Sequence, residues 1–182
     1  EWLLHLAKHA PAGLPAAARI TAPVLAAARA IAADPAASSA DAVKAIEQRT
    51  NHDVKAVEYH LREQLADVGA DAATLELVHF GCTSEDINNL AYALILKDAR
   101  TDVLLPLMQR VVDTIKAQAL QYADIPLLAR THGQTATPST MGKEFANTVA
   151  RLQRQLQQFG KVELLGKING AVGNYNAHMI AY

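Results

Sequence analysis

Four short polar runs in this 182-residue chain combine histidine, hydroxyl, amide and charged side chains closely enough to do chemistry. They cover residues 50–53, 79–89, 130–140 and 167–176. The first three runs each carry a histidine, whose imidazole can hold or release a proton near neutral pH. Each of these three is predicted to open a helix, where free backbone N–H groups and the helix dipole favour anions. The runs therefore suit a ligand that carries phosphate and carboxylate groups.

Ordinary helix starts account for roughly half of these polar residues. Asn51 can cap a helix, and Thr83 with Asp86 resembles a capping box. Capping does not account for His52 beside a cap, or for His132 in a segment rich in Gly, Gln and Thr. These two histidines are therefore the first candidates for chemistry.

Other reactive side chains are interpreted as structural. Cys82 has no evident cationic neighbour that would lower its pKa, so we expect a small buried residue and not a nucleophile. The histidines lack metal-ligand spacing, and the chain contains no phosphate-cradling glycine loop and no dinucleotide fingerprint. A structural role is expected for four histidines outside the candidate set: His5, His9, His60 and His178.

Composition excludes several classes of protein. With 51% hydrophobic and 19% charged residues the chain is not intrinsically disordered, and a net charge of −1 argues against nucleic-acid binding through bulk positive charge. No apolar run is long enough to cross a membrane, and a single cysteine fits a reducing, cytoplasmic compartment. The chain opens without Met, and we interpret it as a piece of a longer protein.

The apolar spacing predicts an all-α fold in two parts. Short helices broken by prolines fill residues 1–81, which we expect to form a small N-terminal helical domain. Residues 82–182 are expected to begin a bundle of long helices. Two long helices with apolar stripes cannot bury both stripes against each other, so the bundle needs helices from elsewhere in the protein or from other subunits.

Individual elements of the second part can also be predicted. A long helix should run from Ser84 to about Tyr122, and Pro106 should kink it and free the carbonyl of Asp102. A second long helix should begin at Thr137 and Pro138, with proline in the tolerated first turn. Two short apolar stretches, residues 127–131 and 162–168, could pair as a small β-hairpin.

The four runs resemble those of one enzyme family. They read T-N-H-D-V-K-A-V-E-Y at 50–59, C-T-S-E-D-I-N-N at 82–89, R-T-H-G-Q-T-A-T-P-S-T at 130–140 and G-K-I-N-G-A-V-G-N-Y-N-A at 166–177. With these motifs the chain resembles the adenylosuccinate lyases of the aspartase/fumarase superfamily. One departure is Thr135, where this family usually has proline and where the change is expected to loosen the turn.

The resemblance implies a reaction and an assembly. The reaction would be β-elimination of fumarate from adenylosuccinate to give AMP, and the same family usually cleaves the succinyl-carboxamide ribotide of purine biosynthesis. It needs no metal and no organic cofactor. The partners implied are a small nucleotide substrate and three further copies of the chain, in a cytoplasmic homotetramer whose sites are each built from three subunits.

The resemblance also implies roles for the motif residues. His132 would be the general acid, and Thr83 and Ser84 would hold a carboxylate of the succinyl group, in agreement with the helix-start argument. His52 would lie near the phosphate or assist the acid. Substrate contacts are implied for this whole further set: Asn51, His52, Asp53, His79, Gln134, Lys167 and Asn169.

The family's base is a serine on a loop of the type G-S-S-x-M-P-x-K-x-N-P, and this chain contains no such run. The chain would therefore hold the acid half of the site without the base half. We expect that it cannot turn over substrate by itself.

Two other functions stay open. One is a sibling lyase of the argininosuccinate lyase or fumarase type. Those families tend to place leucine after the motif histidine, and Gly133 would leave more room for a nucleotide. The other is a non-catalytic helical oligomerisation module, which would have no need for R-T-H-G-Q at a helix entry.

Overall fold

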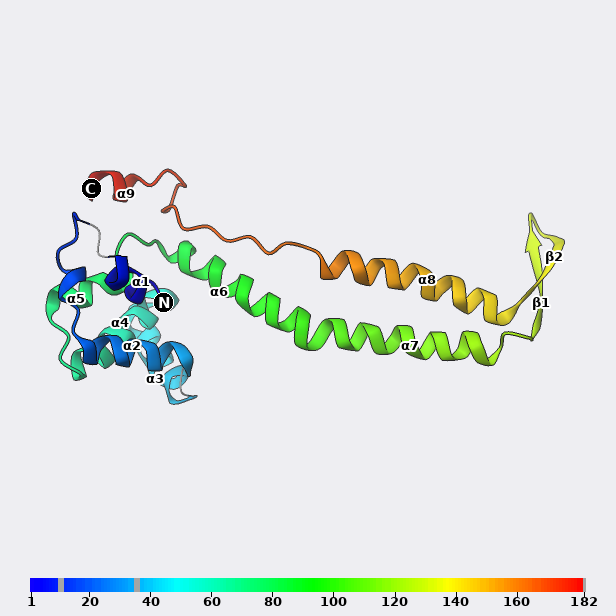
Figure 1. Ribbon diagram of the computed structural model, residues 1–182, viewed down its shortest axis with the longest axis horizontal. Coiled ribbons are helices and arrows are strands. Elements are labelled where there is room, and N and C mark those ends of the chain that lie inside the picture. The colour runs from blue at the N-terminus through cyan, green and yellow to red at the C-terminus, as the bar shows by residue number, and fades with distance from the viewer. Residues whose placement is uncertain (10–11, 35–36, 182) are drawn as a thin grey trace. The chain divides into compact units, whose positions relative to one another are not determined.

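The computed structural model describes residues 1–9, 12–34 and 37–181 and divides the chain into two compact units. The first unit comprises Glu1–Ala91 and Gly166–Tyr182, and the second comprises Tyr92–Leu165. Helices dominate both units, and one two-stranded hairpin lies in the second (Figure 1). The predicted helical class and the presence of a short hairpin are thus confirmed. The predicted domain boundary after residue 81 stays a prediction.

The first unit contains short helices around a small apolar core. Its elements are α1 (Trp2–His9), η1 (Ala17–Arg19), α2 (Ala22–Ala33), α3 (Ala37–Thr50), α4 (Asp53–Asp67), α5 (Ala72–Glu76), η2 (Leu77–His79), the start of α6 (Ser84–Asp98) and α9 (Asn176–Ala181). The buried cluster is Leu3, Leu6, Ala17, Ile20, Val24, Leu65 and Leu77. The proline-broken N-terminal stretch therefore supplies much of this core.

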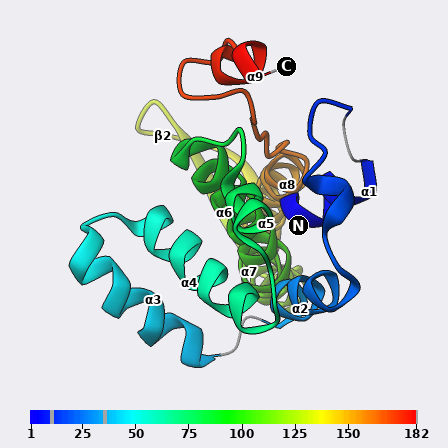
Figure 2. The ribbon, with the colours of Figure 1, turned by 90° about the vertical axis from the view of Figure 1, so that its left-hand side faces the viewer.

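The turn between α3 and α4, which lie side by side (Figure 2), places the first polar run. Asn51 has φ of 51° and donates its backbone N–H to Glu47 O at 2.8 Å, so it ends α3 in the left-handed conformation that asparagine tolerates. The predicted cap at Asn51 is wrong. His52 caps α4, because its Nδ1 accepts a hydrogen bond from Lys55 N at 3.3 Å.

The predicted long helix is confirmed and runs without interruption over residues 84–121. It consists of α6, a π-helical segment η3 (Ala99–Leu104) and α7 (Leu105–Gln121). In η3 the hydrogen bonds span five residues, as in the bond from Leu105 N to Arg100 O. Because the π-segment directly precedes Pro106, the wider turn accommodates the proline ring without ending the helix.

Strand β1 (Pro126–Thr131) pairs antiparallel with β2 (Gln134–Thr140) across a two-residue loop, His132–Gly133. The predicted pairing of residues 127–131 with 162–168 is wrong, and 162–168 form no strand. The loop residues have φ of 52° and 73°, as the type I′ hairpin turn requires. A two-residue loop also costs less closure entropy than a pairing across some thirty residues.

The predicted helix start at Thr137–Pro138 is wrong as well, because both residues lie in β2. The strands contain an irregularity between Leu128 and Arg130, and Pro138 pairs at its edge, opposite Leu128. Proline is tolerated at bulges because no ladder N–H is lost there. Helix α8 (Met141–Gly160) begins three residues later, capped by Thr140 Oγ1, which accepts from Lys143 N at 3.2 Å.

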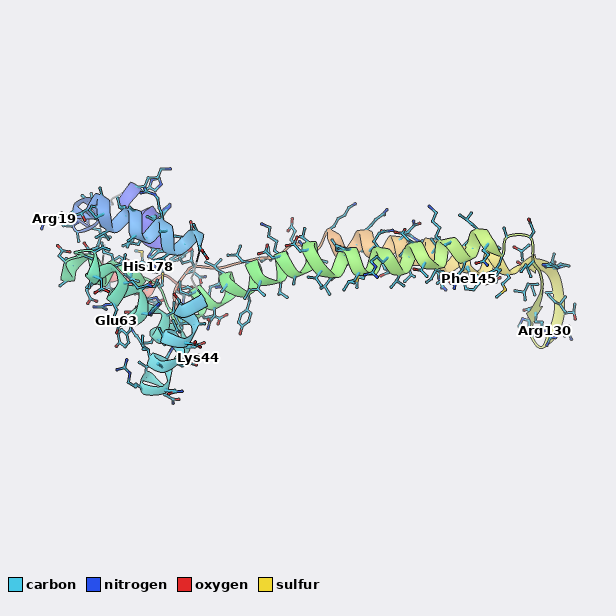
Figure 3. All side chains as sticks on the ribbon, turned by 90° about the horizontal axis from the view of Figure 1, so that it is seen from below. Arg19, Lys44, Glu63, Arg130, Phe145 and His178 are labelled. Atoms are coloured by element: carbon cyan, nitrogen blue, oxygen red, sulfur yellow. The ribbon has the colours of Figure 1, made fainter. Side chains whose placement is uncertain are left out.

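Helices α7 and α8 pack against each other in the second unit. Val112, Ala119 and Val149 are buried there, and the rings of Tyr122 and Phe145 lie 6.0 Å apart between centroids. Figure 3 labels Phe145 on α8. Many large apolar side chains of the long helix are nevertheless exposed: Leu90, Tyr92, Leu94, Ile95, Leu96, Val103, Leu104, Leu107, Met108, Val111 and Leu120. This apolar surface fits the expectation that further helices must cover the pair.

Gly142 permits the close approach of α8 to the end of α7. A Cβ atom there would lie 2.6 Å from Ala123 Cα and would also overlap Ala119 O. We predict that Gly142→Ala lowers the free energy of unfolding by about 1–3 kcal/mol, because backbone must move to admit the methyl group. Thermal or denaturant unfolding measures this difference.

Gly160→Ala is the matched control on the same helix. Its Cβ would meet only Leu105 side-chain atoms, at 3.8 and 3.9 Å, so the change should be neutral or mildly stabilising. Equal destabilisation by both variants would contradict the backbone-contact explanation.

Candidate active site

The first and second polar runs meet in the first unit through a serine–histidine contact. Ser84 Oγ lies 3.3 Å from His52 Nε2, although the two residues are 32 positions apart. His52 Nδ1 already accepts from Lys55 N, so a neutral imidazole in this arrangement carries its proton on Nε2 and donates it to Ser84 Oγ. The hydroxyl proton of Ser84 is then available to a ligand.

Asp53 completes this cluster at the start of α4. Its Oδ1 accepts from Val54 N at 2.7 Å and lies 3.2 Å from His52 Nδ1. The pKa of Asp53 is lowered, chiefly by the Val54 hydrogen bond, which with the Asn88 side chain and the His52 ring outweighs desolvation. Asp53 is thus a carboxylate that stabilises positive charge on His52 when the ring is protonated.

Thr83 and Asp86 confirm part of the predicted capping box at the start of α6. Asp86 Oδ2 accepts from Thr83 N at 2.9 Å, and Asp86 N donates to Thr83 O at 3.1 Å. Within the part of the chain that the structure describes, the Thr83 hydroxyl has no hydrogen-bond partner. The Thr83 and Ser84 hydroxyls are therefore adjacent donors at the N-terminal end of α6, where an anion is favoured.

Asp86 also binds the fourth polar run. Its two carboxylate oxygens accept from Asn169 N at 3.1 Å and Gly170 N at 3.2 Å, and Oδ1 lies 2.7 Å from Lys167 Nζ. The carboxylate is fully buried. Desolvation raises its pKa, but the Lys167 ammonium and the hydrogen bonds from Thr83 and Asn169 outweigh it and hold the pKa at about 2.

Asn89 adds a second link to the same segment, one turn further along α6. Its Oδ1 accepts from Lys167 N at 2.7 Å, and its Nδ2 donates to Lys167 O at 3.0 Å. The side-chain amide thus pairs with the Lys167 backbone as a neighbouring strand would. Lys167 and Asn169 are therefore held beside Thr83 and Ser84, as a shared site requires.

His79 lies at the end of η2, also in the first unit. Near it, the buried Glu58 pairs with Lys55 at 2.6 Å and with Arg62 at 3.2 Å. Desolvation raises the pKa of Glu58, but the Lys55 ammonium and the Arg62 guanidinium outweigh it and hold that pKa below its usual value, with a smaller contribution from His79. The electrostatic surroundings of His79 are therefore those of a structural ion-pair cluster.

His132 and Gln134 belong to the second unit. His132 is the first loop residue of the hairpin and is exposed, and Gln134 opens β2 opposite Thr131. The third run opens a helix only at its last residue, because Thr140 caps α8. The rest of the run forms the end of β1, the turn and β2, so His132 and Gln134 do not lie at a helix start as expected; Figure 3 labels Arg130 on β1. Thr135 pairs opposite Arg130 and keeps an N–H that proline would lack, so it fits the strand.

Glycine at position 133 is explained by its positive φ, and not by any neighbouring atom of this chain that a side chain would meet. Its φ is 73°, and a Cβ atom would meet nothing within 4 Å. Among residues 1–9, 12–34 and 37–181, three that are not glycine also have positive φ: Asn51, His132 and Tyr175. Each lies in one of the polar runs, and such conformations gather at functional sites.

The links that Asp86 and Asn89 make to the fourth polar run were missed from the sequence, as was the interaction of Asn88 with Asp53. Asp86 was recognised only as a capping residue. A signal was present, because a helix-opening Asp and an Asn three positions later lie on one face of the helix. Their partners lie some 80 residues away, and the sequence gives no indication of that pairing.

A family profile described as Lyase matches residues 2–182, so the chain belongs to this lyase family. Among its curated relatives are adenylosuccinate lyases. That of Escherichia coli strain K12 is 54% identical over 182 residues, which are 100% of this chain and 40% of the relative. That of Vibrio cholerae is 59% identical over 140 residues, 77% of this chain and 31% of the relative. The chain thus spans about 40% of the length of the first of these relatives.

Solved structures of related enzymes share the fold. The 3-carboxy-cis,cis-muconate lactonizing enzyme from Pseudomonas putida matches with a TM-score of 0.65 and 28% identity, over 97% of this chain and 41% of that one. A fumarate lyase from Mesorhizobium sp. BNC1 matches with a TM-score of 0.69 and 23% identity, over 96% of this chain and 39% of that one.

The described residues contain no group of three or more His, Cys, Asp or Glu side chains that could hold a metal ion. None of the helices formed by residues 1–9, 12–34 and 37–181 is long and apolar enough to cross a membrane.

The environment of Cys82 predicts low reactivity. Desolvation and the nearby Asp86 carboxylate raise the pKa of the Cys82 thiol to about 11. At pH 8 we expect iodoacetamide to alkylate it roughly 100-fold more slowly than an unperturbed thiol. Mass spectrometry of timed samples measures the rate, and the same reaction in denaturant is the control. A native rate equal to the denatured rate would contradict this assignment.

Proposed function

We propose that the protein containing this chain is an adenylosuccinate lyase, which eliminates fumarate from adenylosuccinate to give AMP. It would also cleave the succinyl-carboxamide ribotide of purine biosynthesis. The observation that carries the proposal is the 54% identity with the Escherichia coli adenylosuccinate lyase along all 182 residues of the chain. The polar residues gathered in the first unit have the chemistry that this substrate needs.

The reaction is a proton-transfer problem. A base removes a proton from the carbon beside a carboxylate, the carbon–nitrogen bond breaks, and the leaving nitrogen receives a proton from a general acid. Negative charge that develops on the carboxylate must be stabilised by fixed donors. The Thr83 and Ser84 hydroxyls at the start of α6 suit that task, and His132 is the proposed acid.

His52 is proposed to orient Ser84. The Nε2–H donated to Ser84 Oγ leaves the serine proton for a substrate carboxylate, which is how a fixed donor becomes useful in a transition state. Asn51, Asp53, His79, Gln134, Lys167 and Asn169 remain proposed contributors to substrate binding.

The active protein is proposed to be a cytoplasmic homotetramer. The exposed apolar side chains of the long helix support an assembly, since a bundle of further helices would cover them. In such an assembly His132 of one subunit and the Thr83–Ser84 pair of another would complete one site. The serine base would come from a part of the protein outside this chain.

The central role of His132 can be tested with His132→Asn in the full-length protein. The substitution removes the acid, whereas asparagine tolerates the positive φ of this loop position. We predict that kcat with adenylosuccinate falls by roughly 100-fold or more while the melting temperature is unchanged or higher. The ultraviolet absorbance change as AMP and fumarate form measures the rate.

His9→Asn is the control, because His9 is an exposed residue at the end of α1 and lies in none of the polar runs. It should leave kcat unchanged. Undiminished activity of His132→Asn would contradict the acid role. Cleavage of argininosuccinate, or hydration of fumarate, in place of adenylosuccinate cleavage would instead identify a sibling lyase.

The 182-residue chain by itself should not release fumarate, because it lacks the proposed base. Purified chain with adenylosuccinate is expected to match its own His132→Ala variant within error. Fumarate release clearly above that variant would show that the chain contains a complete site.

A further inference from the structure

We propose that Asp86 is a positioning residue that fastens the Lys167–Gly170 turn to the N-terminal end of α6, so that Thr83, Ser84 and Asn169 form one rigid part of the site. The kinetic test of this inference rests on the proposed function. The structural test, which measures amide hydrogen exchange, depends only on contacts within the first unit. For this role the Asp86 side chain does not need to touch the substrate.

The Asp86 carboxylate is fully buried, and a buried charge is tolerated only when donors surround it. Its donors come from two segments, Thr83 N on one side and Asn169 N, Gly170 N and Lys167 Nζ on the other. Removing the charge would leave the second segment without its main attachment.

The Lys167 ammonium is occupied by this link. Its Nζ lies 2.7 Å from Asp86 Oδ1 and donates to Gly170 O at 2.7 Å. The ammonium therefore both neutralises the buried carboxylate and closes the turn that presents Asn169. The main role of the Lys167 ammonium is therefore to hold Asp86 and the turn in position, and not to pair directly with the charge of an anionic substrate.

The turn also holds the side-chain amide of Asn169. Asn169 Nδ2 donates to Gly173 O at 3.3 Å, but its Oδ1 is buried and has no hydrogen-bond partner among the described residues. A buried acceptor without a donor is costly unless a ligand or water supplies one. The Asp86 link thus holds an unused acceptor in the unit that also carries the Thr83 and Ser84 hydroxyls.

Asn89 makes the inference testable without loss of the fold. Because its amide pairs with both the N–H and the C=O of Lys167, the returning segment keeps one attachment when Asp86 is altered. The expected defect is therefore a loosened turn and not an unfolded unit.

The experiment compares Asp86→Asn, Lys167→Met and the double variant in the full-length protein, with adenylosuccinate as substrate. Glu85→Gln is the matched control, since it removes one negative charge from the neighbouring, exposed position. We expect each single variant to raise KM by roughly 10- to 100-fold with a smaller loss in kcat, as for misplaced binding groups. The double variant should be no worse than the poorer single variant, because both break one link. Glu85→Gln should behave as wild type.

Amide hydrogen exchange supplies a readout that does not need the reaction. Asn169 N–H and Gly170 N–H should be protected in the wild type and exchange at least tenfold faster in Asp86→Asn. If wild type shows this protection but does not cleave adenylosuccinate, the proposed function fails while the role of Asp86 as a link stands.

Two results would overturn the inference. One is that Asp86→Asn keeps the KM and the amide exchange rates of the wild type. The other is that the KM increases of the two single variants multiply in the double variant. If Asp86→Asn does not fold, the KM values of Lys167→Arg and Lys167→Met are compared instead. Arginine keeps the ion pair with Asp86, so the KM of Lys167→Arg should lie within about threefold of the wild-type value. Equal KM values for these two lysine variants would then reject the link.

Discussion

The buried Asp86 carboxylate is the constraint on which the arrangement of the first unit's polar residues depends. A charge removed from water must be surrounded by donors, and here they are supplied by the start of α6 and by a turn some 80 residues later. The same side chain therefore accepts the Thr83 N–H at the start of α6 and holds the Lys167–Gly170 turn. Asn89 repeats the connection through backbone-like hydrogen bonds, so the position of Lys167 is determined twice.

Backbone strain gathers where chemistry is proposed. Asn51, His132 and Tyr175 all have positive φ, and each lies in a polar run. At His132 the left-handed conformation makes the tight hairpin turn and exposes the imidazole. The hairpin stabilises this geometry locally, since its strands pair on both sides of the loop. A proposed proton donor is thus held by a short, locally determined element and not by a long-range core.

The sequence was sufficient for the helical class and for the long helix through Pro106, because apolar spacing and the scarcity of glycine act locally. It failed at Thr137–Pro138, where proline fits both the first turn of a helix and the edge of a bulge, and local composition cannot separate the two. Asn51 failed as a cap for a similar reason, since asparagine suits both a helix start and the left-handed end of the preceding helix. In the candidate site, His52 and Ser84 were predicted as site residues from the sequence. Their contact and the Asp86–Lys167 ion pair could not be predicted, because each joins residues that are far apart in the sequence.

A crystal structure of the full-length protein with AMP and fumarate bound tests the central claim most directly. We expect a fumarate carboxylate to lie within hydrogen-bond distance, about 2.6–3.2 Å, of the Thr83 and Ser84 hydroxyls. We also expect the His132 imidazole to lie at about the same distance from the exocyclic nitrogen of AMP. Both ligands bound away from these residues, or a different side chain at the AMP nitrogen, would contradict it.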